Sequence, residues 1–401
     1  MLAYGVPSEP QPGLPGQSPR TPVPMVDFRR QYDAIRQEIL AAIEQVCDSQ
    51  QFILGPAAEQ FERAAAQWLG ASDAVGCASG TDALWLTLAA TGIGPGASVL
   101  TTPFSFFASV SCILRAGATP VLADIDPRTF NLCPEQAERA LSRHSGPPIR
   151  AILPVHLYGQ CAAWDSFSTL REKRGVLLLE DAAQAFGAAW RGRRAGTLGD
   201  MAAFSFYPTK NLSAFGDAGM VSTSDPELAA KARMLRNHGM RRRYFHDEAG
   251  WNSRLDGIQA AVLSVKLRYV DAWNRQRQNR AAYYDALFSA QGLAEPGPYP
   301  EYGVVLPWVD PRGTHIFHQY VIRVRRRDAL REFLSERRIG SEVYYPLPLH
   351  RQQALATLGY APDAFPESQQ AADEVLALPM FPELTAAEQE RVVSAIAEFL
   401  S

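Results

Sequence analysis

One lysine stands where lysine is unusual, between an apolar run and a glycine-rich return of the chain. Lys210 lies in AAFSFYPTKNLSAFGDAGMV, downstream of a β-like run that contains Ser205. Partial burial lowers the pKa of an amine, and the neutral form can condense with an aldehyde to give a Schiff base. A lysine on a solvated loop is the alternative, and Lys210 taken alone does not decide between the two.

Two carboxylates end another apolar run. In GVLLLEDAAQAFGA, the run Val176 to Leu179 leads into Glu180 and Asp181. A buried carboxylate is costly unless a cation or a hydrogen-bond donor pairs with it. The pyridine nitrogen of pyridoxal phosphate (PLP) would supply such a partner, since it becomes protonated beside the carboxylate and so strengthens the ring as an electron sink. A helix cap or a metal ligand would also explain the carboxylates in isolation, but Lys210 downstream favours the cofactor.

A third segment has the pattern of an anion site. In CASGTDALWLTLAA, a strand leads through Ser79, Gly80 and Thr81 into a helix. The free N–H groups of a helix start, together with the two hydroxyls, can bind a phosphate. The sequence contains neither GxGxxG nor GxxxxGK[ST], which disfavours a dinucleotide or nucleoside-triphosphate site. In the nearby TTPFSFFAS, Phe106 could stack on a flat ring, although core packing is the ordinary alternative.

The elements that must position these residues form an α/β pattern. Apolar runs alternate with helix-length segments, which predicts a largely parallel sheet covered on both faces. Ligands bind such sheets at the carboxyl ends of the strands, where the residues above lie. The seven expected strands are AVGCAS, SVLTTP, TPVLADI, AILPVHL, GVLLLED, AAFSFYP and GMVSTS.

Composition divides the chain into three parts. Residues 1–24 are rich in Pro, Gly and Ser and predict a flexible arm. Residues 25–270 form the large domain with the sheet, and residues 271–401 form a small C-terminal α+β domain. We expect a strongly helical segment over about 256–289, a strand-like EVYYPL, and a polar loop over RRRYFHDEAGWNSRL.

Charge and cysteine content restrict the class of protein. A net charge of −3 and a pI near 6.2 give no case for binding nucleic acid or a membrane surface. The five cysteines have no metal-type spacing, and no apolar stretch predicts a signal peptide or a transmembrane helix. We therefore expect a cytoplasmic protein without a metal site.

Six motifs, in order, resemble the DegT/DnrJ/StrS family of sugar aminotransferases from about Val26 to the C-terminus. They are SGTDAL, TTPFSFFAS, EDAAQAFGA, FSFYPTKN, GDAGMV and GWNSRLDGIQAAVL. The resemblance implies PLP as cofactor and the PLP-dependent transferase fold type I, with a mostly parallel seven-stranded sheet.

The resemblance also implies roles for individual residues. Lys210 matches the Schiff-base lysine, Asp181 the partner of the pyridine nitrogen, and Gln184 the partner of the ring's phenolic oxygen. Phe106 and Ala183 match the residues that contact the two faces of the ring. Gly80, Thr81 and Ser205 match phosphate contacts, and Asn252 matches an asparagine that reaches the phosphate from a second subunit. His156, Tyr345 and His350 resemble substrate-side positions.

The activity implied is transfer of an amino group, with L-glutamate as donor, to a nucleotide-linked keto sugar, 3-keto rather than 4-keto. The partner implied is a second copy, with the active sites shared across a homodimer and the apolar helix after GWNSR in the interface. A dehydratase of the same fold has histidine in place of the lysine, so Lys210 disfavours it. A regulatory protein without catalysis would be expected to have lost Lys210, Asp181 or Gln184. A nicotinamide dehydrogenase is disfavoured because this sequence lacks its glycine-rich fingerprint.

Overall fold

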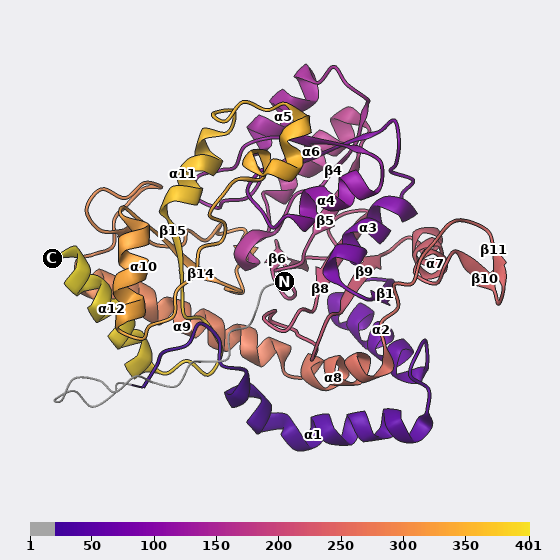
Figure 1. The fold of residues 1–401 in the computed structure, drawn as a ribbon, viewed down its shortest axis with the longest axis horizontal. Helices are drawn as coiled ribbons and strands as arrows, with labels where there is room; N and C mark the ends of the chain where they lie inside the picture. The colour runs from indigo at the N-terminus through magenta and orange to yellow at the C-terminus, as the bar shows by residue number, and fades with distance from the viewer. Residues whose placement is uncertain (1–20) are drawn as a thin grey trace.

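A seven-stranded sheet forms the centre of the larger part of the molecule (Figure 1). The structure is a computed structural model that describes residues 21–401. The strand order is β1-β9-β8-β5-β4-β2-β3, and β9 alone runs antiparallel to its neighbours. All seven expected strands are present: β1 (Asp73–Cys77), β2 (Ser98–Thr101), β3 (Thr119–Leu122), β4 (Ile149–Ile152), β5 (Leu177–Asp181), β8 (Met201–Ser205) and β9 (Gly219–Thr223).

Both faces of this sheet are covered, which explains why its strands read as continuous apolar runs. Successive strand residues enter different apolar layers: Leu178 belongs to one cluster and Leu179 to the other. On one face lie α3 (Gly80–Ala90), α4 (Ala108–Arg115) and α7 (Pro226–Leu235). The other face packs against α2 (Pro56–Leu69), α5 (Pro134–Arg143), α6 (Trp164–Arg174) and α8 (Gly257–Leu267).

The helical segment expected over about 256–289 consists of two helices, α8 and α9 (Val270–Ala290). Along the lower edge of Figure 1, α8 lies between α1 (Phe28–Ser49) and α2. Its apolar residues Ala260, Val262 and Leu263 are completely buried within this one chain. The expectation that this helix presents an apolar face to a second subunit is therefore wrong.

The C-terminal part is built on a small antiparallel sheet of β12 (Val304–Val305), β14 (Tyr320–Val324) and β15 (Val375–Leu378). Helices α9, α10 (Arg327–Glu336), α11 (Pro366–Glu374) and α12 (Ala386–Leu400) pack around it. EVYYPL does not form a strand, apart from one bridge from Glu342 to Ala377. Pro346 and Pro348 lack the N–H groups that a ladder needs, which explains the failure.

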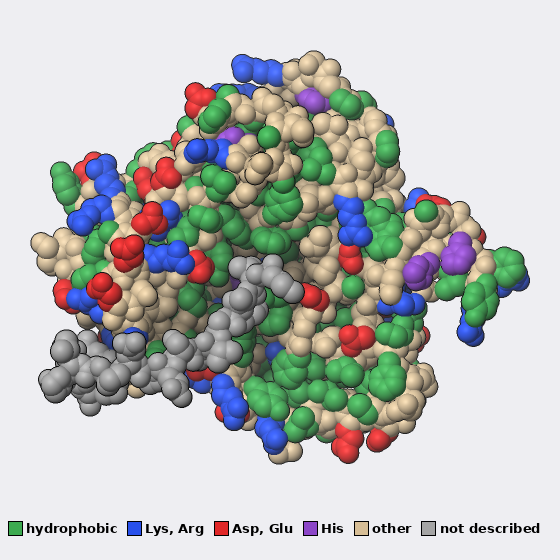
Figure 2. Space-filling model, in the orientation of Figure 1, with side chains coloured by type: hydrophobic (Ala, Val, Ile, Leu, Met, Phe, Trp, Pro, Cys, Tyr) green, Lys and Arg blue, Asp and Glu red, His purple; other side chains and the backbone are tan. Residues whose placement is uncertain are grey.

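Three further segments complete the chain. A sheet of β6 (Ala189–Trp190), β7 (Arg193–Arg194) and β13 (Gly313–Thr314) joins the two parts. The expected polar loop contains a hairpin of β10 (Met240–Arg242) and β11 (Phe245–His246), which projects from the body (Figures 1 and 2). Short 3-10 turns cover Leu157–Gly159, Leu349–Arg351 and Gln353–Leu358.

The prediction of a flexible arm over residues 1–24 is wrong for its last residues. Residues 1–20 lie outside the described part of the chain, but Val23 is 2% exposed and forms a parallel bridge with Ile339. Its backbone bonds to Arg338 and Gly340 anchor residues 21–24 on the C-terminal part. Among the described helices, none is long and apolar enough to span a bilayer.

Candidate active site

Asp181 is the last residue of β5, and its carboxylate is buried at 3% exposure. Oδ2 accepts a bond of 2.7 Å from the Ser109 hydroxyl, and Oδ1 accepts one of 3.2 Å from the backbone N–H of Ala183. Burial raises the pKa of Asp181 even though these bonds, and the nearby positive charge of Lys210, act to lower it. The site therefore holds a carboxylate that a further cation or donor would stabilise.

Lys210 lies in the connection from β8 to β9, and its backbone N–H donates to Tyr207 O at 2.8 Å. Burial lowers the pKa of Lys210 to about 8, although the Asp181 carboxylate acts to raise it. A substantial fraction of this amine is therefore neutral near physiological pH. The structure thus brings Lys210 and Asp181 into one site, as the strand-end argument predicted.

The start of α3 lies directly against the end of β8. A Cβ built on Gly80 would stand 2.5 Å from Cβ and 2.9 Å from Oγ of Ser205, so only glycine permits this approach. Ser79 caps α3 by accepting a bond from the N–H of Asp82. The free N–H groups of Gly80 and Thr81 and the Ser205 hydroxyl therefore lie together, in an arrangement suited to an anion.

An exposed aromatic ring and an amide lie around Tyr345, which is near enough to Asp181 for that carboxylate to act to raise the pKa of its hydroxyl. Phe106 is 58% exposed, and its ring centre is 6.3 Å from that of Tyr345. Gln184 accepts a 2.7 Å bond from the N–H of Tyr158, and its amide nitrogen lies 3.2 Å from the Tyr345 hydroxyl. Phe106 has no core role, because a packed core ring would be buried; its exposure suits stacking on a ligand.

The two histidines assigned to the substrate side lie in the interior. His156 is completely buried; its Nε2 lies 3.0 Å from Glu180, and its Nδ1 accepts a 3.1 Å bond from the N–H of Ala162. Both ring nitrogens are thus paired, and we withdraw His156 as a substrate contact. His350 is 5% exposed, and its Nε2 bonds to Pro362 O at 3.1 Å. Its Nδ1 is buried without a hydrogen-bond partner, so its substrate role stays a prediction, as does that of Tyr345, which lies beside Gln184 and Phe106.

Asn252 is exposed, in the segment between the projecting hairpin and α8. The adjacent Ser253 donates to Asp82 at 2.9 Å and lies 3.4 Å from the N–H of Ala78, just before the anion-binding turn of the same chain. The structure therefore places Asn252 beside its own chain's helix start. Its action in a second subunit stays a prediction.

Sequence reasoning missed two parts of the site. Ser109, on α4, donates to Asp181 and bonds to Ser105 at 2.8 Å, and the only signal was its spacing of one helical turn from Ser105. Glu180 was grouped with Asp181, but its side chain lies with His156. Its oxygens accept three backbone bonds of 2.7 to 2.9 Å, from Gly196, Leu198 and Gly199.

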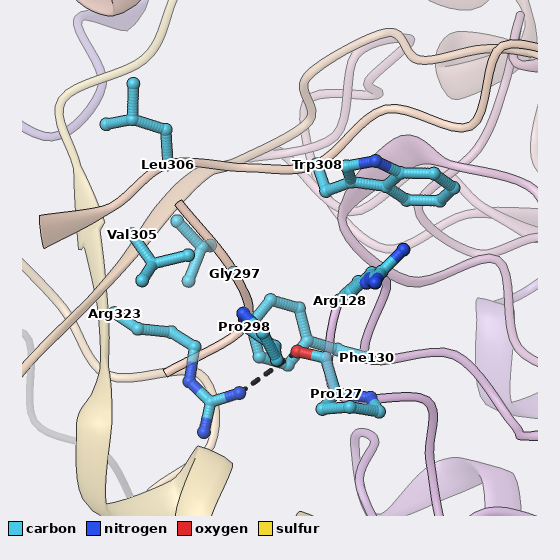
Figure 3. A pocket seen from close by; sticks show the side chains of 10 residues that line it. Pro127, Arg128, Phe130, Gly297, Pro298, Val305, Leu306, Trp308 and Arg323 are labelled. Atoms are coloured by element: carbon cyan, nitrogen blue, oxygen red, sulfur yellow. Dashed lines mark hydrogen bonds between the residues drawn. The ribbon is translucent and has the colours of Figure 1, made fainter. Parts of the chain in front are cut away.

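A separate cavity of about 230 Å³ lies between the two parts of the chain (Figure 3). Its wall includes Phe130, Trp308 and Arg323, and Arg323 donates to Pro127 O at 3.0 Å. Phe130 packs against Phe104, so this cavity is one aromatic layer away from Tyr345. It shares no lining residue with the cavity beside Lys210.

These groups fit PLP by their chemistry. A neutral amine suits its aldehyde, a buried carboxylate with a raised pKa suits its ring nitrogen, and the cradle at Gly80 suits its phosphate. Phe106 and Ala183 would lie on the ring, and Gln184 would meet its phenolic oxygen. The fold and the site together define a PLP-dependent enzyme of fold type I.

Comparison with known proteins supports this class. The model of the DegT/DnrJ/EryC1/StrS aminotransferase family matches residues 33–397, and the chain belongs to that family. A pleiotropic regulatory protein of Geobacillus stearothermophilus is 46% identical over 94% of this chain and 98% of its own. The dTDP-3-amino-3,4,6-trideoxy-alpha-D-glucose transaminase of Streptomyces venezuelae is 42% identical over 96% of this chain and 97% of its own.

A solved structure agrees with the observed fold. The crystal structure of S. venezuelae DesV in complex with a ketimine intermediate matches with a TM-score of 0.89 and 41% identity. The match covers 95% of this chain and 99% of the chain in that crystal structure. The chain is accordingly a PLP-dependent aminotransferase.

Proposed function

We propose that this enzyme transfers an amino group from L-glutamate to the keto group of a nucleotide-linked sugar, at C3 of the sugar ring. The observation that carries the proposal is the pairing of a partly neutral Lys210 with the buried Asp181 beside the cradle at Gly80. Support for the sugar and the position comes from the Streptomyces venezuelae relative, whose name specifies a 3-amino sugar.

The residues divide the chemistry between them. PLP supplies a ring that delocalises the negative charge formed when a proton leaves the carbon bearing the amino group. Lys210 would hold the cofactor and, once displaced, would take that proton as a general base and return it to C4′ of the cofactor, the carbon on the other side of the amino nitrogen. Asp181 would keep the ring nitrogen protonated. The anion-binding turn of Gly80 and Thr81, with Ser205 and Asn252, would hold the phosphate.

The substrate experiment is a panel of keto nucleotide sugars, dTDP-linked and UDP-linked, with glutamate as donor. We expect faster turnover of 3-keto than of 4-keto sugars. Faster turnover of the 4-keto sugars would reverse the assignment. A 4-keto activity is the second candidate, and the panel compares it directly.

A regulatory protein without catalysis is the less favoured alternative, and the Geobacillus stearothermophilus relative is named a pleiotropic regulatory protein. The retention of Lys210, Asp181 and Gln184 in one site favours an enzyme. A purified protein without visible PLP absorbance, and without turnover on the panel, would favour regulation instead.

We further propose a homodimer. The hairpin projects from the body with Tyr244 75% exposed and Phe245 56% exposed, and Phe215 near the Lys210 loop is 46% exposed. Exposed aromatic side chains of this kind fit burial against a second copy. Arg241 and Arg242 on the same hairpin would suit the substrate diphosphate.

The shared site is tested by mixing two inactive variants, Lys210→Ala and Asn252→Ala, under conditions where subunits exchange. If Asn252 acts across the interface, one hybrid site contains both intact residues and activity returns. If exchange is verified and the mixture stays inactive, Asn252 acts within its own chain. We place the protein in the cytoplasm, where its five free cysteines would stay reduced.

A further inference from the structure

Two cations are buried close to the Lys210 loop, and the carboxylate of Glu383 is near enough to act to raise the pKa of each. Arg277 on α9 and Lys266 on α8 are each 4% exposed. Within residues 21–401, neither forms an ion pair: Arg277 donates to the carbonyls of Phe317, His318 and Met380, and Lys266 donates to Ser213 at 2.9 Å. Buried charges are normally paired, so this arrangement points to an anion that binds here.

A small cavity joins these groups to Lys210. Lys210, Ser213 and Arg277 line it together, and Nε of Arg277 is buried without a hydrogen-bond partner. Ser213 accepts its bond from Lys266, which leaves the hydroxyl hydrogen of Ser213 for another acceptor. The cavity therefore offers a guanidinium N–H and a hydroxyl, two donors that suit the two oxygens of a carboxylate.

The size of the cavity restricts the ligand. The space open to atom centres is about 10 Å³, enough for one water molecule or one carboxylate group and too small for a sugar ring. Asp27 and Glu383 also line the cavity, but Asp27 pairs with Arg30. Burial raises the pKa of Glu383, and the nearby charge of Arg277 acts to lower it.

We infer that Arg277 and Ser213, with Lys266 holding the Ser213 hydroxyl, bind the α-carboxylate of the amino donor. The α-carboxylate is the choice because it is one bond from the carbon whose proton Lys210 would remove, and Lys210 lines the same cavity. The inference rests on the proposed function, in which an amino acid is the donor. The keto sugar has no carboxylate at this position, so the subsite serves one half of the reaction only.

The test uses the PLP-loaded enzyme and its Ser213→Ala and Arg277→Lys variants. Binding of glutamate is followed by single-turnover absorbance, and binding of unreactive succinate by calorimetry. We expect the Kd of both to rise about ten-fold in Ser213→Ala, which corresponds to about 1.4 kcal/mol, and at least as much in Arg277→Lys. The second half-reaction with a keto sugar should be unchanged. Ser264→Ala, whose hydroxyl bonds to Ala260 O within α8, is the matched control.

A comparison of donors identifies the carboxylate. 4-Aminobutyrate lacks the α-carboxylate, so it should bind the wild type and Ser213→Ala equally. Wild-type Kd values for glutamate and succinate in Ser213→Ala would overturn the inference, even if Arg277→Lys fails to fold. A wild type that binds succinate through Ser213 but forms no product with glutamate would refute the proposed donor and leave the subsite intact.

Discussion

Replacing Asp181 with asparagine isolates the electrostatic part of its role. Asparagine has the same shape, and it can still accept the 3.2 Å bond from Ala183 while Ser109 turns to accept from the amide. What disappears is a negative charge next to a protonated ring nitrogen. At about 4 Å and an effective dielectric constant of about 20, that interaction amounts to about 4 kcal/mol. Since about 1.4 kcal/mol corresponds to a ten-fold change, we expect turnover to fall about 10³-fold.

The same variant should fold at least as well as the wild type. Burial raises the pKa of Asp181 above its unfolded value, so its ionisation opposes folding as pH rises through the folded pKa. Asparagine removes that penalty, and the apoprotein at pH 7 should unfold at the same or a higher urea concentration. PLP should still bind, because Lys210 and the phosphate cradle remain. Turnover within ten-fold of wild type, with PLP bound, would refute the reasoning.

Three other predictions concern the cofactor cradle and its support. Borohydride reduction and peptide mapping should place the pyridoxyl group on Lys210, and label on another lysine would contradict this. The rate at which the apoprotein captures PLP should increase as pH rises to about 8 and then level off, because the amine of Lys210 has become neutral. Gly80→Ala places a Cβ 2.5 Å from Cβ of Ser205, so the Kd for PLP should rise at least ten-fold, whereas Gly94→Ala meets only one atom, at 3.5 Å, and should bind normally. Glu180→Gln places an amide NH₂ group against backbone N–H donors, so it should lower the free energy of unfolding, measured by urea titration, by about 1 to 3 kcal/mol. An unchanged urea midpoint would contradict the structural role of Glu180.

The sheet could be predicted because its physical signal is local. Each strand is a short apolar run bounded by turn residues, as expected for strands that are buried on both faces of a sheet. The break between α8 and α9 could not be predicted, because neither Arg268 nor Tyr269 is a helix-breaking residue. The anchoring of Val23 was also invisible, because it depends on contacts with Arg338 and Gly340, over 300 residues away.

The candidate site was predictable where residue type and strand position coincide. Lys210, Asp181 and Gly80 follow the ends of apolar runs, and parallel strands bring those ends to one edge. The motif match gave His156 a position along the chain but not the direction of its side chain. His156 follows β4, and its side chain turns toward Glu180, with Trp164 packed edge-to-face against its ring.

Glu180 and Asp181 show why a pair of neighbouring carboxylates can have opposite roles. Consecutive residues of a strand point to opposite faces, so the two side chains enter different environments. Glu180 accepts three backbone N–H bonds and lies 3.0 Å from His156 Nε2, which satisfies both oxygens and ties the turn after β7 to the sheet. Asp181 accepts only two bonds in a buried position, and its pKa is raised. An incompletely satisfied carboxylate beside a partly neutral lysine is unfavourable for folding alone, so its presence is best explained by a cationic ligand that completes it.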